Sequence, residues 1–274
     1  MSVLFGRCLN LRVVPALCLA LCSLGFLGMG CATSGSAWAP DAQRSVDLPS
    51  TAEALLALAD AEVAVKPRTP HTVDRALAAL EALESLSTSP DFQTHWRIAR
   101  ASFYLSDLVS DDHLQTRYAA LGVKHAEKAV EARGDAVEGH YYLALNIAKQ
   151  VEAEGEVKGL QRMLDIAKRA AELDAGFDQA GPLRLMGKVY MVAPEWPTSV
   201  GDRDESVEVL KRAVSLHSTP LNRLFLGQAF FHIDAFKKAI PHVRSALKAG
   251  RKSGLEERWL DEARSYLMRM GASE

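Results

Sequence analysis

Histidines are the residues of this sequence best suited to bind a metal or to move a proton near neutral pH. There are eight, at positions His71, His95, His113, His125, His140, His217, His232 and His242. None shares a predicted helix face with another ligand at a spacing of three or four residues, which a His-Glu-x-x-His metal site requires. We therefore predict surface or edge histidines and no bound metal.

The acidic cluster at 202–205 is the next candidate for chemistry. Asp202, Asp204 and Glu205 could offer oxygen ligands to a cation. Arg203 lies among them, however, and the helix dipole favours acidic residues at a helix N-terminus in any case. We interpret the cluster as the start of a helix.

Motifs of known catalytic types are absent from the sequence. It has no phosphate-binding loop and no Gly-x-Ser-x-Gly elbow. Its four cysteines are Cys8, Cys18, Cys22 and Cys31, so a chain that begins at Cys31 has one cysteine and no disulfide. A net charge of −2 and a pI near 6.5 give no field to attract nucleic acid. We predict a non-enzymatic protein that uses no cofactor and binds no nucleic acid.

The first thirty residues predict export. Arg7 and Arg12 precede an apolar run at 13–27, which is too short for a membrane span. The run ends in small residues, of which Gly30 comes directly before Cys31. This segment resembles a bacterial lipoprotein signal, which implies removal of residues 1–30 and lipidation of Cys31. The alternative is an ordinary secretory signal that is cleaved later.

That later cleavage would follow Ala37 or Ala39. Residues 31–50 are rich in Ser, Thr, Gly, Ala and Pro without a helical period, which predicts a flexible tether. Ala32 after the lipidated cysteine favours the outer membrane by analogy with enteric bacteria. We therefore expect the domain at 51–274 to be anchored by lipid at the periplasmic face of a bacterial membrane.

A repeat is clearest between Leu221 and Arg251. Leu226-Gly227 is followed by Phe230, then Ala239 and Ala246, at offsets that place small residues where two helices cross. The spacing resembles a tetratricopeptide repeat, a helix–turn–helix unit of about 34 residues. Such a unit buries its apolar faces only by stacking on neighbours. The resemblance implies an α-solenoid.

Apolar periodicity extends the pattern over the rest of the domain. It predicts helices at 51–65 and 72–86, then pairs at 91–132, 143–173, 186–216 and 221–251, with a last amphipathic helix at 255–267. The predicted fold is all-α: a tetratricopeptide-like α-solenoid of about five helix pairs plus a C-terminal capping helix, whose charged side, with Arg258, is expected to face water. The equivalent positions Arg100, Ala144, Gly187 and Gly227 are spaced by 44, 43 and 40 residues. Because uneven units stack with uneven twist, we expect a closed, compact superhelix.

A narrower resemblance covers residues 139–247. Its residues are Tyr141-Tyr142-Leu143-Ala144-x-Asn146, Leu173-Asp174, Gly181-Pro182-x-Arg184-x-Met186-Gly187, Pro194-x-x-Pro197 through Gly201-Asp202, and Pro220-Leu221-Asn222. This pattern resembles the tetratricopeptide-containing T-component lipoproteins associated with TRAP transporters. The resemblance implies a periplasmic lipoprotein that binds a substrate-capturing partner protein and an apolar ligand.

The expected working surface is the concave face of the solenoid. Projection of the repeat register places on it Arg97, Tyr104, Tyr141, Arg184, Lys188, Gln228, Phe231 and His232. Aromatic residues interleaved with Arg and Lys suit an acidic peptide, the C-terminus of a protein or an organic carboxylate. The alternative is that these residues only solubilise the surface.

Asn146 and Asn222 lie among apolar neighbours, where a buried amide needs hydrogen bonds. We expect both to bridge backbone between repeats, with ligand contact as the alternative.

The functional hypothesis is a non-enzymatic binding and assembly module, as the T-component of a TRAP-type solute uptake system. Its expected partners are other proteins, such as a periplasmic substrate-binding protein, and a homo-oligomer is compatible with the pattern. A scaffold for outer-membrane or pilus assembly is the alternative in the same class. A hydrolase or lectin-like activity in the insert at 191–204 is the alternative in another class.

Overall fold

The computed structural model describes residues 48–86, 91–154 and 157–274. Within these ranges the chain forms eleven α-helices and no β-strand, with one isolated bridge between Glu195 and Gly201. The helices are α1 (Ala52–Ala64), α2 (Pro70–Leu86), α3 (Phe92–Leu108), α4 (Asp112–Ala132), α5 (Val137–Glu154), α6 (Lys158–Leu173), α7 (Phe177–Val192), α8 (Arg203–Leu216), α9 (Pro220–His232), α10 (Phe236–Ser253) and α11 (Glu257–Arg269).

This order confirms the prediction of five helix pairs followed by one final helix. Consecutive helices pack against each other, and the first helix of each pair also contacts the first helix of the next, from α1–α3 to α7–α9. The last helix, α11, contacts both α9 and α10. Such packing of each unit on its neighbours is the architecture of an α-solenoid.

Local sequence explains where the helices begin and how closely they pack. The side chains of Asp91, Asp111 and Thr219 accept hydrogen bonds from backbone N–H groups at the starts of α3, α4 and α9. At Gly227 a Cβ atom would lie 2.5 Å from Cγ2 of Val243, so only glycine allows α9 and α10 this approach. The predicted small residue at the helix crossing is therefore confirmed.

The core consists of three clusters that follow the chain. One joins α1 to α4, a second extends from α3 through α8, and a third joins α7 to α11. Because α3, α4, α7 and α8 contribute to two clusters each, the clusters form one stack.

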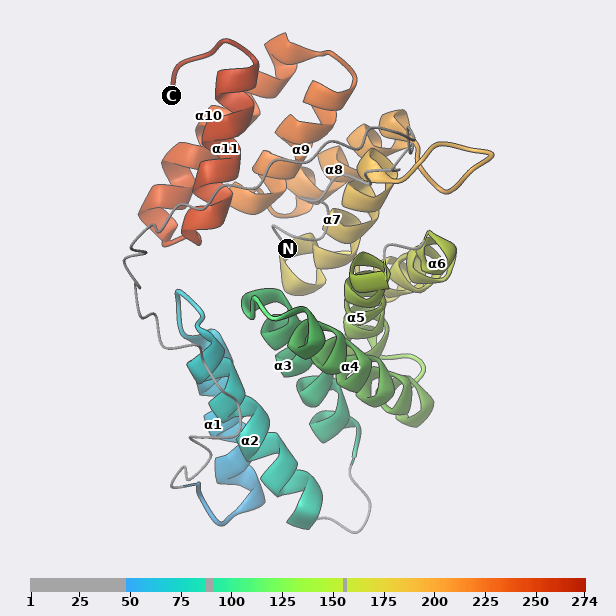
Figure 1. Ribbon diagram of the computed structural model, residues 1–274, viewed down its shortest axis with the longest axis vertical. Coiled ribbons are helices and arrows are strands. Elements are labelled where there is room, and N and C mark those ends of the chain that lie inside the picture. The colour runs from blue at the N-terminus through green and yellow to red at the C-terminus, as the bar shows by residue number, and fades with distance from the viewer. Residues whose placement is uncertain (1–47, 87–90, 155–156) are drawn as a thin grey trace, which may run out of the picture.

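The stack curves until its two ends meet (Figure 1). Arg68, in the connection between α1 and α2, lies 3.7 Å from Glu256, in the connection between α10 and α11. Arg258 of α11 donates to Oδ2 of Asp107 in α3 at 2.6 Å. The structure thus agrees with the expected closed, compact superhelix. It corrects the expectation for Arg258, which bridges the ends and does not simply face water.

None of the helices described here is long and apolar enough to cross a membrane. The predicted signal peptide at 1–30, lipidation at Cys31 and most of the tether at 31–50 lie outside the described residues.

Candidate functional site

A cavity of about 490 Å³ lies where the two ends of the solenoid meet. Its helical walls come from α3, α5, α7, α9 and α11, with Ser253 at the end of α10. We call the side of the solenoid formed by the first helices of the pairs the inner face. The lining includes Lys66, Arg68, Phe103, Tyr104, Asp107, Tyr141, Asp178, Arg184, Leu221, Leu255, Glu256, Arg258 and Trp259. Three of the predicted concave-face residues, Tyr104, Tyr141 and Arg184, are therefore brought together.

A left-handed turn at the start of α7 forms one wall. Asp178, Gln179 and Ala180 have φ values of 46°, 58° and 64°. None of the three is glycine, and each residue held in this region costs about 1–2 kcal/mol. Strain of this kind concentrates at functional sites, where surrounding contacts must hold it in place.

Side chains of the cavity hold this turn. The Tyr141 hydroxyl donates to Oδ2 of Asp178 at 2.8 Å, and Nη2 of Arg184 donates to the same oxygen at 3.2 Å. Nη1 of Arg184 also donates to the Gln179 carbonyl at 3.2 Å. Burial and the Asp178 carboxylate raise the pKa of Tyr141 well above its ordinary value, so the hydroxyl stays protonated and donates.

Gly181 makes room for this arrangement. A Cβ atom at this position would lie 2.4 Å from the hydroxyl oxygen of Tyr141. Only glycine, which has no side chain, therefore lets the Tyr141 hydroxyl reach Asp178.

Asn222 and Asn146 bridge elements by their side-chain amides, the arrangement expected of both. Nδ2 of Asn222 donates to the carbonyls of Gln179 at 2.9 Å and His217 at 2.7 Å, and its Oδ1 accepts from Arg184. Nδ2 of Asn146 donates to the carbonyls of Ala99 and Tyr142, and so ties α3 to α5. Both residues are fully buried.

The cavity lining also carries positive charge that the sequence interpretation missed. The Arg68 guanidinium stacks 4.0 Å from the centre of the Tyr104 ring and donates through Nε to the Val63 carbonyl. Lys66 is an exposed residue of the cavity lining and forms no ion pair with a described residue. Partial burial of its ammonium and the neighbouring Arg68 lower its pKa. Lys66 and Arg68 both lie in the connection before α2, which a register of helix positions does not include.

The other half of the inner face is covered by α11, which corrects the prediction for four residues. Lys188 and Gln228 are buried, at 5% and 0% exposure. Nζ of Lys188 donates to Oε1 of Gln228 at 3.2 Å, and Nε2 of Gln228 donates to Oε1 of Glu262 on α11 at 2.9 Å. These side chains belong to the interior and are not open to a ligand.

Phe231 and His232 also lie against α11. The Phe231 ring is 5.1 Å from the ring of Tyr266, and Nε2 of His232 lies 3.2 Å from the Tyr266 hydroxyl. Burial and the nearby Lys188 lower the pKa of His232 to about 4. Arg97, predicted on the same face, instead forms an ion pair with Asp60 of α1 at 3.0 Å.

Two histidines contradict the prediction of surface or edge positions. His95 and His125 are 6% and 3% exposed, and their Nδ1 atoms lie 3.2 Å apart. Burial, followed by the other histidine, lowers the pKa of His125 to about 4. A carboxylate oxygen of Glu84 completes a group of three ligand atoms. The sequence spacing did not indicate this group because its three residues come from three different helices.

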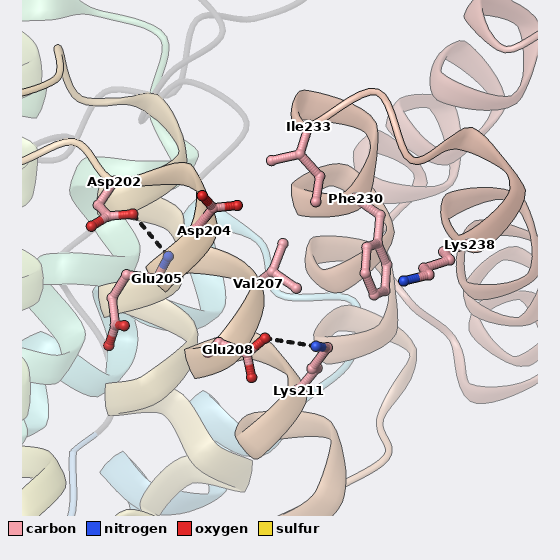
Figure 2. A pocket seen from close by; sticks show the side chains of 9 residues that line it. All are labelled: Asp202, Asp204, Glu205, Val207, Glu208, Lys211, Phe230, Ile233 and Lys238. Carbon is pink, nitrogen blue, oxygen red and sulfur yellow. Dashed lines mark hydrogen bonds and ion pairs between the residues drawn. The ribbon is translucent and has the colours of Figure 1, made fainter.

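The acidic cluster at 202–205 begins α8, as predicted. Oδ1 of Asp202 accepts from the backbone N–H of Glu205 at 2.9 Å. Figure 2 shows the Asp204 and Glu205 carboxylates pointing apart, beside a surface hollow that also includes Phe230 and Lys211. Among the described residues this cluster does not form a group of metal ligands.

Comparison with solved structures identifies helical repeat proteins. TTC0263, a thermophilic TPR protein of Thermus thermophilus, superposes with a TM-score of 0.59 at 18% identity, over 80% of this protein and 100% of that one. The MamA protein superposes with a TM-score of 0.41 at 15% identity, over 75% of this protein and 95% of that one. No family model and no curated protein matches the sequence. The likeness to TTC0263 and the stacked helix pairs together show that the protein has the tetratricopeptide-like α-solenoid fold.

Proposed function

We propose that this protein is a non-enzymatic binding module whose inner cavity takes an organic carboxylate with an apolar body. The observation that carries the proposal is the exposed residue Lys66 in the lining of a cavity walled by Phe103, Tyr104 and Leu255. Cavities of a few hundred cubic ångströms with apolar walls and a few fixed polar groups are typical ligand sites.

The charges of the cavity favour an anionic group beside Lys66. Arg184 is paired with Asp178, Arg258 with Asp107, and Arg68 with Glu256. Lys66 is the cation left over among the lining residues that the structure describes. A ligand carboxylate would supply its missing counterion, while the ligand's apolar body lies against the aromatic rings.

The Asp178 carboxylate supports binding over turnover. It accepts from Tyr141 and from Arg184, which also bonds the carbonyl of Gln179 in the strained turn. These groups satisfy one another, so they shape a wall and leave no base directed at a substrate.

The closed shape favours a small ligand over a long peptide. With α11 across one half of the inner face and the ends of the solenoid in contact, an extended partner segment has no continuous surface there. This supports the role of a T-component in a TRAP-type uptake system over a scaffold for outer-membrane or pilus assembly. A substrate-binding protein gene beside this one would support it, and assembly genes in that place would contradict it.

The proposed location is the periplasmic face of the outer membrane, with a lipid anchor on Cys31. The basis is the charged front, apolar run and Gly30-Cys31 step of the sequence. Mass spectrometry of the protein from bacterial membranes should find an acylated N-terminus at Cys31. A mature protein that begins after Ala37 or Ala39 would contradict the anchor.

Calorimetric titration with 4-phenylbutyrate tests the cavity, with 4-phenylbutyramide as the neutral match. We expect the acid to bind about tenfold more tightly than the amide, a difference of about 1.4 kcal/mol. Lys66→Met should abolish this difference, whereas Lys237→Met, a change at an exposed lysine outside the cavity, should preserve it. Equal affinity of acid and amide for the unmodified protein would refute the carboxylate site.

A further inference from the structure

We propose that Glu84, His95 and His125 form a binding site for a zinc ion. The three residues lie on α2, α3 and α4, and none of them lines the inner cavity. Two imidazole nitrogens and one carboxylate oxygen are a ligand set that zinc prefers, and the same combination occurs in zinc enzymes with one open position.

The distance between the histidines fits a tetrahedral ion. Zinc–nitrogen bonds of about 2.0–2.1 Å at a tetrahedral angle place two ligand nitrogens about 3.3–3.4 Å apart. The Nδ1 atoms of His95 and His125 lie 3.2 Å apart. Both rings therefore present the same nitrogen to one point, at nearly the spacing that a shared ion imposes.

Glu84 supplies the third ligand after a small movement. Its Oε1 lies 4.0 Å from Nδ1 of His125, and all three ligand atoms lie within 4.8 Å of one another. The side chain of Glu84 is 30% exposed and belongs to the last turn of α2. Rotation about its side-chain bonds can therefore bring the carboxylate closer to the two histidine nitrogens. The histidines are held by burial, and the carboxylate is the adjustable member.

Lys128 is the competitor for the carboxylate. Its ammonium lies 3.9 Å from Oε1 of Glu84, and its side chain is 42% exposed. Since a flexible exposed ammonium loses little when it turns to water, zinc can replace it beside Glu84. Three protein ligands then leave one coordination position for water.

Such an ion would join the first helix pair to the second. Glu84 belongs to the first pair, and both histidines belong to the second. The first pair packs its helices on the second pair and meets the far end through Arg68 and Glu256. A metal that binds only the folded arrangement therefore stabilises this end of the solenoid.

The test is a titration of the full-length protein with Zn²⁺, and with Co²⁺ as a coloured substitute. Cys8, Cys18, Cys22 and Cys31 are replaced by serine in every sample, so that thiolates bind no metal. We expect one equivalent of Zn²⁺ to bind and raise the melting temperature, and Co²⁺ to give the strong visible absorption of tetrahedral nitrogen and oxygen coordination.

His95→Ala, His125→Ala and Glu84→Gln should each weaken binding at least tenfold. His113→Ala, at an exposed histidine of α4, is the matched control and should leave it unchanged. If a histidine variant fails to fold, Glu84→Gln still tests the metal site. Glu84 is partly exposed, and glutamine has nearly the same size as glutamate. Absence of stoichiometric binding, or equal binding by Glu84→Gln and the protein without that change, would overturn the site.

Discussion

The two halves of the inner face have similar residues, but one half lines a cavity and the other is buried beneath α11. Around α3, α5 and the start of α7, Tyr104, Tyr141 and Arg184 line an open cavity. Around the end of α7 and α9, Lys188 and Gln228 are buried beneath α11. Residues that the repeat register places on one face thus become either a binding wall or core. What decides is whether another helix lies over them.

The largest expected effect comes from loosening the covered half. Leu267→Ala on α11 removes a side chain that is 1% exposed and should lower the free energy of unfolding by about 2–5 kcal/mol. Met268→Ala, next to it and 78% exposed, should change it by less than about 0.5 kcal/mol. Urea denaturation measures both. Equal effects of the two variants would mean that α11 does not cover this half in solution.

An intermediate effect is expected at the wall of the open half. Gly181→Ala places a methyl group against the Tyr141 hydroxyl and should lower the free energy of unfolding by about 1–3 kcal/mol. Because Tyr141 would lose Asp178, binding of 4-phenylbutyrate should weaken as well. Gly134→Ala, where a Cβ meets its nearest atom at 3.6 Å, is the control. Unchanged binding in Gly181→Ala would mean that the strained turn does not contribute to ligand binding.

The smallest expected effect is the contribution of His232, in the covered half, to the pH dependence of stability. The folded protein holds the pKa of His232 at about 4, against 6.5 in the unfolded state. As pH falls between these values the unfolded state binds the proton and the folded state does not, so stability decreases. With allowance for partial solvent screening, we expect the free energy of unfolding of His232→Gln to decrease by about 1 kcal/mol less over this pH range than that of the unmodified protein. His217→Gln, at an exposed position, should follow the unmodified protein in denaturation measured across this range.

Sequence periodicity predicted the helix pairs because it reports which positions of one helix contact the next. Asn146 and Asn222 were also predictable, since an amide among apolar residues must find backbone partners. Both properties belong to a single helix and its immediate neighbours. The burial of Lys188 beneath α11 depends on a more distant element, because Glu262 lies in a later unit. Nothing in the sequence of α7 indicates that contact.

The rest of the site was missed for related reasons. Lys66 and Arg68 lie in a connection, outside any helical register. The left-handed turn falls on Asp178, Gln179 and Ala180, although the nearby glycines are the residues that sequence reasoning associates with positive φ. In the same way Glu84, His95 and His125 are separated in the sequence and meet only when α2, α3 and α4 pack.

The contact between Arg258 and Asp107 joins residues that are 151 positions apart. An open array of repeats can fray from either terminus, because each unit is held by its neighbours alone. Here loss of the last helix also removes a restraint on the second pair, and loss of the first pair removes the partner of Glu256. These two contacts therefore link the two ends of the solenoid. We expect its repeats to unfold together and not one after another from a terminus.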